Sequence, residues 1–146
     1  MQIENTEIQT HNLKVISAPG GDVMHAMKSS SKGFRGFGEA YFSVIENGLV
    51  KAWKRHKKMT LNIIVPLGKI RFVLFDDRKN KNQFKEYILS PEDYFRLTIP
   101  PMVWVGFQDL TKKKSMLLNI ADIEHNPQEL EKIDVDKIPY SWDLII

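Results

Sequence analysis

The sequence predicts an all-β protein, either a β-sandwich or a β-barrel, and two observations support this. Short segments rich in β-branched and aromatic residues recur along the chain, and turn signals separate them at intervals of about 8–12 residues, which gives roughly eight to ten strands. The 146 residues have an apolar fraction of 42% and a charged fraction of 27%, which are ordinary for a globular protein with one core. We therefore expect a single domain that spans residues 1–146.

The first expected strands surround a strong turn signal. Residues 39–46, "EAYFSVIE", alternate and end at Asn47-Gly48, the dipeptide typical of a two-residue hairpin. "LVKAW" at 49–53 is then expected to be the return strand. Residues 59–77, "MTLNIIVPLGKIRFVLFDD", predict two further strands with a bend at "PLG".

The second half of the chain continues this pattern. Strands are expected within 84–90, 94–101, 102–110 and 115–124. Only 126–137, "NPQELEKIDVDK", resembles a helical turn, with a proline just inside its start. Segment 19–38, "PGGDVMHAMKSSSKGFRGFG", is rich in Gly, Ser and Lys, and predicts a long mobile loop of the kind that carries binding residues.

Composition limits the location and the partners of the protein. The chain has no cysteine, which excludes disulfides and cysteine-based zinc sites and fits a reducing cytoplasm. We expect no secretory signal at the N-terminus and no membrane insertion, because no apolar run approaches the roughly 20 residues of a membrane helix. The net charge of +3 is concentrated in 51–58 and 111–115, which suits anionic small molecules as well as nucleic acid.

The histidines do not predict a metal site. His11, His25, His56 and His125 include no pair at the i, i+2 spacing that would direct two imidazoles from one strand to one ion. We therefore expect neither a metal nor another cofactor.

The basic stretch "VKAWKRHKK" at 50–58 allows three interpretations. Strand alternation predicts that Lys51, Trp53 and Arg55 share one face, and that Lys54 and His56 share the other. The stretch is then a solvated strand end, a nucleic-acid surface, or the wall of a pocket for a phosphorylated ligand. In the pocket, Lys51 or Arg55 would meet phosphate oxygens and Trp53 would stack on a ring.

Two other motifs indicate structural roles. The adjacent carboxylates of Asp76 and Asp77 would point to opposite faces of a strand, so "DDR" predicts a turn with an Asp–Arg pair rather than a catalytic pair. In "IPPMVWVGF" at 99–107, Trp104 and Phe107 are expected to fill the core or a pocket wall, and Gly106 to permit a close backbone approach.

Five motifs occur in a characteristic order across residues 35–143: "GLVKAWKRH", "VPLGKIRFVLFDDR", "ILSPEDYFRLTIPPMVWVGF", "LLNIADIEHNP" and "IPYSWDL". This order resembles the dTDP-4-dehydrorhamnose 3,5-epimerase family. The resemblance implies a cupin-type double-stranded β-helix, or jelly-roll barrel, with a short C-terminal helical segment. It also implies a cytoplasmic homodimer that acts in deoxysugar, O-antigen and lipopolysaccharide biosynthesis.

The resemblance also assigns roles to residues of the basic stretch. Lys51 falls on the position of the arginine that meets the nucleotide phosphates, and Lys54 on that of the histidine base. His56 follows two residues later and is the alternative base. A base that removes a proton next to a keto group needs a pKa near the working pH.

Further positions match or depart from the family pattern. Val105 replaces a histidine of the motif "HGF", and Asn119 is the polar residue nearest to the expected position of the tyrosine proton donor. In "FRGFGEA", Arg35, Phe37 and Glu39 match a segment that contacts the nucleotide, sometimes across the dimer.

Three functional hypotheses remain. In the first, the chain is an epimerase or isomerase of a nucleotide-linked 4-keto-deoxysugar in which Lys54 or His56 is the base. In the second, it is a non-catalytic cupin that binds a nucleotide sugar or supports a glycosyltransferase. In the third, which rests on the lysine runs alone, it is a small nucleic-acid-binding barrel.

Overall fold

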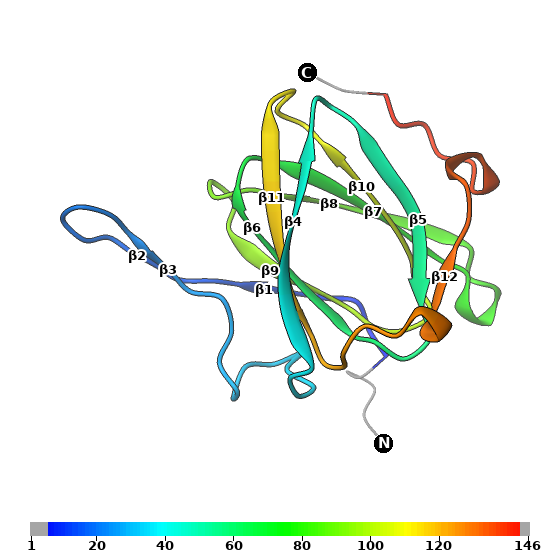
Figure 1. The fold of residues 1–146 in the computed structure, drawn as a ribbon, viewed down its shortest axis with the longest axis horizontal. Coiled ribbons are helices and arrows are strands. Elements are labelled where there is room, and N and C mark those ends of the chain that lie inside the picture. Colours follow the sequence, from blue (N-terminus) through cyan, green and yellow to red (C-terminus); the bar gives the residue numbers. More distant parts are fainter. Residues whose placement is uncertain (1–5, 144–146) are drawn as a thin grey trace.

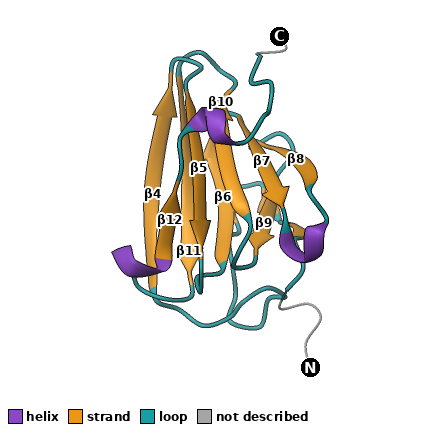
Figure 2. Ribbon diagram, turned by 90° about the vertical axis from the view of Figure 1, so that its right-hand side faces the viewer, coloured by secondary structure: helices purple, strands orange, loops and turns teal. Residues whose placement is uncertain are grey.

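A computed structural model describes residues 6–143 and contains two five-stranded antiparallel sheets that face each other (Figures 1 and 2). The first sheet has the order β1 (Gln9–Asn12), β9 (Phe95–Ile99), β6 (Leu61–Leu67), β11 (Lys114–Ala121), β4 (Glu39–Glu46). The second has the order β12 (Leu130–Lys132), β5 (Val50–His56), β10 (Trp104–Asp109), β7 (Ile70–Asp76), β8 (Gln83–Leu89). The all-β prediction is confirmed.

Smaller elements complete the fold. Strands β2 (Val15–Ile16) and β3 (Val23–Met24) form a hairpin that projects away from the body of the protein (Figure 1). The helical structure of residues 6–143 consists of three 3-10 turns, which are η2 (Arg78–Asn80), η3 (Pro127–Glu129) and η4 (Val135–Lys137). The expected helical turn over 126–137 is therefore two separate turns with β12 between them.

The turn at Asn47-Gly48 forms, but the predicted hairpin is wrong. Both residues have positive φ angles, 61° and 70°, and the amide of Leu49 donates to the carbonyl of Glu46 at 3.1 Å. However, β4 pairs with β11, whereas β5 pairs with β10 and β12 in the other sheet. A turn dipeptide determines only the local direction of the backbone, and burial of the inner faces decides which strands pair.

The other turns lie where the sequence predicts them. The bend between β6 and β7 needs Gly68, whose φ is +85° and whose added Cβ would lie 2.2 Å from Oγ of Ser115. The "DDR" turn contains the expected pair, because Nε of Arg78 donates to Oδ1 of Asp76 at 2.9 Å. A Cβ on Gly106 would lie 2.8 Å from Cβ of Ala52, which confirms the close approach expected there.

The main core fills the space between the two sheets. Inward-facing side chains such as Phe72, Leu74 and Leu97 have no exposed surface there. A second cluster of Trp53, Val73, Trp104 and Ile138 lies apart from this core. Residues 133–143, which we call the C-terminal strap, supply Tyr140 and Trp142 to this cluster.

The segment predicted as a mobile loop, 19–38, is anchored on the first sheet. The guanidinium of Arg96, which is 2% exposed, donates to the carbonyls of Ala26 and Lys32. Nδ2 of Asn62 donates to the carbonyl of Gly33 at 3.0 Å. These contacts hold the second half of the segment against strands β9 and β6.

The core assignment predicts a large difference between two leucine truncations. Leu97→Ala should lower the free energy of unfolding by about 2–5 kcal/mol, because it leaves a cavity in a close-packed interior. Leu49→Ala is the control, since Leu49 is 60% exposed and its loss should change stability by less than about 0.5 kcal/mol. Urea unfolding measures both, and equal effects would contradict the assignment.

Candidate active site

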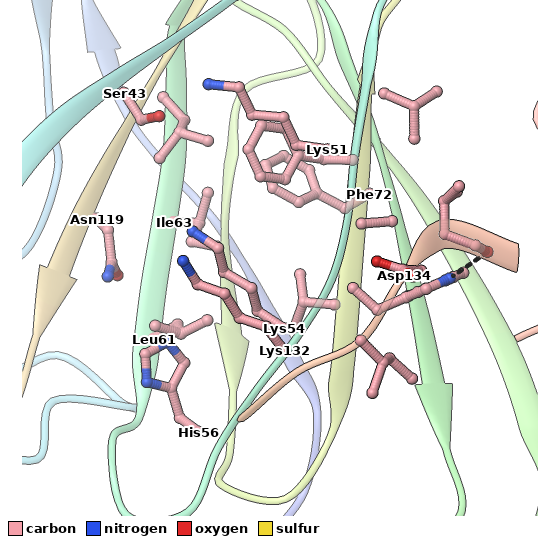
Figure 3. Close-up of a pocket in the computed structure, with 18 of the residues that line it drawn as sticks. Ser43, Lys51, Lys54, His56, Leu61, Ile63, Phe72, Asn119, Lys132 and Asp134 are labelled. Carbon is pink, nitrogen blue, oxygen red and sulfur yellow. Dashed lines mark hydrogen bonds between the residues drawn. The ribbon is translucent and has the colours of Figure 1, made fainter. Parts of the chain in front are cut away.

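A cavity of 770 Å³ opens between the sheets and is walled by both of them and by the start of the C-terminal strap (Figure 3). Strands of the first sheet supply Tyr41, Ser43, Leu61, Ile63, Leu117 and Asn119. Strands of the second sheet supply Val50, Lys51, Ala52, Trp53, Lys54, His56, Phe72, Val105, Phe107 and Lys132, and the strap supplies Ile133, Asp134, Val135 and Asp136. The wall therefore combines an apolar base with an unusual density of ionisable groups.

An irregularity in β5 determines which of its side chains face the cavity. Val105 of β10 pairs with Lys54, but the next residue, Gly106, pairs with Ala52. Trp53 is thus an extra residue in β5, as in a β-bulge, and side-chain alternation shifts by one position there. Lys51, Lys54 and His56 consequently all line the cavity.

The prediction that Lys51 shares a face with Trp53 and Arg55 is therefore wrong, because Lys51 lies on the cavity side with Lys54 and His56. The ring of Trp53 is 1% exposed, its Nε1 donates to the carbonyl of Val135 at 3.1 Å, and its centroid lies 5.4 Å from that of Trp142. Such a ring has no free face on which a ligand could stack. Arg55 lies outside the cavity, where it pairs with Glu131 at 2.6 Å and covers the ring of Trp104 at 4.4 Å.

His56 is held by a carboxylate that the sequence analysis missed. Nδ1 of His56 lies 2.5 Å from Oε2 of Glu129, and the two side chains are 11% and 5% exposed. Oε1 of Glu129 also accepts hydrogen bonds from the backbone amides of Lys58 and Met59, at 3.0 and 3.1 Å. These bonds fix the carboxylate, which in turn orients the imidazole.

The electrostatic environment keeps Glu129 ionised. Burial raises the pKa of Glu129, but the hydrogen bonds from His56, Lys58 and Met59 lower it by more, so the pKa lies below its ordinary value. An ionised carboxylate accepts the proton of Nδ1, which leaves Nε2 of a neutral His56 without a proton. This arrangement of base and orienting carboxylate is that of a general base.

Three lysines line the same cavity. Lys54 pairs in register with Lys132 of the neighbouring strand, and Figure 3 shows both side chains extending into the centre of the cavity. Burial lowers the pKa of Lys54, and the charges of Lys132 and Lys51 lower it further. Nζ of Lys51 donates to the carbonyl of Val44 at 3.0 Å.

Asn119 lies at the cavity, as expected, and holds the hydroxyl of a neighbouring tyrosine. Its Oδ1 accepts from the amide of Asn62 at 3.1 Å, and its Nδ2 donates to the hydroxyl oxygen of Tyr41 at 3.0 Å. Because both ends of the Asn119 amide are hydrogen-bonded, this side chain fixes the position of the Tyr41 phenol. Tyr41 lies opposite Asn119 on the adjacent strand β4 and also lines the cavity.

The predicted residues of the segment "FRGFGEA" lie outside the cavity. Arg35, Phe37 and Glu39 do not line the cavity of their own chain, and Phe37 is 66% exposed. Val105, at the position of the motif histidine, forms part of the apolar wall.

Within residues 6–143, no three His, Asp or Glu side chains lie close enough together to hold a metal ion. None of the helices in this range is long and apolar enough to cross a membrane.

Sequence reasoning also missed the contribution of the C-terminal residues. Glu129 lies 73 positions from His56, and Lys132, Asp134 and Asp136 reach the cavity only because β12 pairs with β5. No local spacing in the sequence signals such a contact. The order of the motifs indicates only that the last ones follow a strand, and it does not predict a contact with β5.

Comparisons with known proteins agree with this architecture. No protein-family model matches the chain. The crystal structure of a dTDP-sugar isomerase from Desulfovibrio desulfuricans G20 is 37% identical and has a TM-score of 0.89, with 97% of this chain and 94% of that chain covered. The dTDP-4-dehydrorhamnose 3,5-epimerase of Bacillus anthracis, solved with TDP and pyrophosphate, shares the fold with a TM-score of 0.83 at 18% identity, over 100% and 90% of the chains. A protein of Haloferax volcanii described as a probable low-salt glycan biosynthesis epimerase is 25% identical over 92% of this chain and 87% of its own length.

The Glu129 contacts predict a pH-dependent difference in stability. Because the pKa of Glu129 is lowered in the folded state, its carboxylate stabilises the fold above about pH 4.5, and this contribution is lost as the pH falls through the lowered pKa. Glu129→Gln should cost about 1–3 kcal/mol at pH 7, and the difference from wild type should shrink in acid. Denaturant titrations from pH 3 to 8 measure it, with the exposed Glu124→Gln as control. A difference that stays constant with pH would contradict the account.

Proposed function

Because the chain belongs to the family of dTDP-sugar isomerases, which has the cupin fold of the dTDP-4-dehydrorhamnose 3,5-epimerases, we propose that it isomerises a nucleotide-linked 4-keto-deoxysugar. The observation that carries this proposal is the buried pair of His56 and Glu129 at the wall of a cation-rich cavity. A general base beside a binding site for anions is what proton abstraction from a sugar nucleotide requires.

His56 is the base in this reaction. Its Nε2 removes the proton from a carbon next to the keto group of the sugar, and the adjacent unsaturated carbon stabilises the carbanion that forms. Glu129 stabilises the imidazolium that forms, since it lies 2.5 Å from Nδ1. Tyr41 is the acid that returns a proton, because Asn119 donates to its oxygen and leaves the phenolic O–H directed elsewhere.

The nucleotide diphosphate lies at the Lys51 end of the cavity. Lys51 and His56 are five positions apart on β5 and line opposite ends of the cavity in Figure 3. Nζ of Lys51 uses one hydrogen for the carbonyl of Val44 and retains two for phosphate oxygens. The sugar then extends from the diphosphate towards His56.

The product enters polysaccharide assembly in this proposal. Deoxysugar nucleotides are precursors of surface glycans, and the relative in Haloferax volcanii is described as a glycan biosynthesis epimerase. We place the reaction in the cytoplasm, in O-antigen or lipopolysaccharide synthesis.

The protein acts as a homodimer in this proposal, through the outer face of the first sheet. The outward positions of β4 and β11 are apolar from Ala40 to Val44 and from Met116 to Ile120, and Phe42 and Val44 remain 64% and 39% exposed. The anchored segment 19–38 covers β9 and β6 but leaves this part of the face open. A second copy would cover it. Arg35, Phe37 and Glu39 would then reach the cavity of that second copy.

Solvent exchange tests the reaction. In deuterium oxide the protein should incorporate deuterium next to the keto group of a dTDP-linked 4-keto-6-deoxyhexose, as measured by NMR. His56→Asn should reduce the rate about 10²–10⁴-fold, and Tyr41→Phe should slow product formation more than exchange. Binding of the nucleotide sugar without any exchange would favour the non-catalytic alternative and overturn the proposal.

Light scattering tests the dimer. Wild-type protein should have twice the mass of the 17.0-kDa chain, and Phe42→Glu should shift it to the monomer, because a charge would be buried without a partner. Leu49→Glu is the control, since Leu49 is equally exposed but lies outside β4 and β11. A monomeric wild type would contradict the dimer while leaving the reaction untested by this experiment.

A further inference from the structure

We propose that Lys54 forms a covalent imine with the keto carbon of the bound sugar, so that the isomerisation proceeds through an enamine. This inference rests on the proposed function, and it assigns the lysine at the centre of the cavity a role that is neither base nor phosphate ligand. Three features of the site support it. They are the position of Lys54 on β5, the lack of a bonding partner for its amino group within residues 6–143, and the neighbouring ammonium group of Lys132.

The place of Lys54 puts its amino group beside the sugar. Lys54 and His56 are two positions apart on β5 and line the same wall of the cavity, whereas Lys51 lies beyond the extra residue Trp53. A nucleotide sugar held by Lys51 and deprotonated by His56 must pass Lys54 between these two points. The keto carbon of the sugar is bonded directly to the carbon that His56 deprotonates. The amino group of Lys54 therefore lies beside this keto carbon.

The amino group of Lys54 is free to react. Within residues 6–143, Lys54 makes no side-chain hydrogen bond and no ion pair, whereas Lys51 donates to the carbonyl of Val44. Figure 3 shows the side chain of Lys54 extended into the cavity beside that of Lys132. A free amine that can approach a carbonyl is the first requirement of imine formation.

Lys132 supplies the second requirement, which is a neutral amine. Lys132 is the direct register partner of Lys54, so their two ammonium groups would repel each other at close range. Burial lowers the pKa of Lys54, and Lys132 and Lys51 lower it further, which increases the fraction of neutral amine at pH 7. A second cation beside a lysine is a known means of activating a lysine that attacks carbonyls.

The imine cycle needs only the substrate, Lys54, His56 and water. The neutral Nζ attacks the keto carbon, the carbonyl oxygen leaves as water after two proton transfers, and a protonated imine remains. Nε2 of His56 removes the proton from the adjacent carbon, and that electron pair forms the enamine. Return of a proton to this carbon regenerates the imine, and one water molecule hydrolyses it to the product ketone and free Lys54.

Borohydride trapping with intact-protein mass spectrometry tests the inference. Wild-type protein incubated with a dTDP-linked 4-keto-6-deoxyhexose and sodium borohydride should gain the mass of that sugar nucleotide, minus water and plus two hydrogens. Peptide mapping should place the adduct on Lys54. Lys54→Arg keeps the charge but cannot form an imine, so it should give no adduct and lower the exchange rate at least about 100-fold. Lys57→Arg, an exposed lysine outside the cavity, is the matched control and should label like wild type.

Two results would overturn the imine, and they separate it from the proposed function. Deuterium exchange by wild type without an adduct, together with substantial activity of Lys54→Arg, would show that a positive charge alone is needed, and the isomerase function would stand. An adduct on Lys51 or Lys132 in place of Lys54 would also overturn it. If wild type shows neither exchange nor adduct, the proposed function fails together with the inference.

Discussion

The extra residue in β5 is the constraint on which the site depends. Trp53 is inserted where β5 passes β10, and its indole is buried beneath the C-terminal strap, bonded to the carbonyl of Val135. One consequence is local, because the shifted alternation directs Lys51, Lys54 and His56 to the same cavity. The other is distant, because the amide and carbonyl of Trp53 pair with Ile133 and hold the strap in place, with Asp134 and Asp136 at the cavity wall.

The cavity holds its buried carboxylate, its lysines and its apolar base at separate positions. The Glu129 carboxylate is paired with His56, and its low pKa keeps it ionised, so the imidazole has a fixed orientation. The lysines form a positive wall that has no fixed carboxylate partner within the described residues, which suits a ligand that brings its own negative charge. The apolar base of Ile63, Phe72 and Leu117 offers water no hydrogen-bonding groups, which strengthens each of these interactions.

Much of the fold could be predicted from the sequence, because strand composition and turn residues are local signals. The bend at Gly68 and the Asp76–Arg78 pair are examples in which a few adjacent residues decide the outcome. Strand pairing after Asn47-Gly48 was mispredicted, since it depends on which faces the rest of the chain buries. The faces of β5 were mispredicted for a related reason, because a bulge is visible only in the register with a neighbouring strand. Glu129 and Tyr41 were missed, as both act through contacts between segments far apart in the sequence.

In the proposed binding mode, the sugar of a nucleotide sugar lies at His56 and its diphosphate lies at Lys51. A crystal structure of the His56→Asn variant with a dTDP-linked 4-keto-6-deoxyhexose tests this binding mode, because the variant should turn the substrate over about 10²–10⁴-fold more slowly than wild type. The account predicts that a carbon next to the keto group lies about 3–3.5 Å from the side chain at position 56 and that phosphate oxygens lie within hydrogen-bonding distance of Nζ of Lys51. A sugar bound outside the cavity, or a diphosphate at the His56 end, would contradict it.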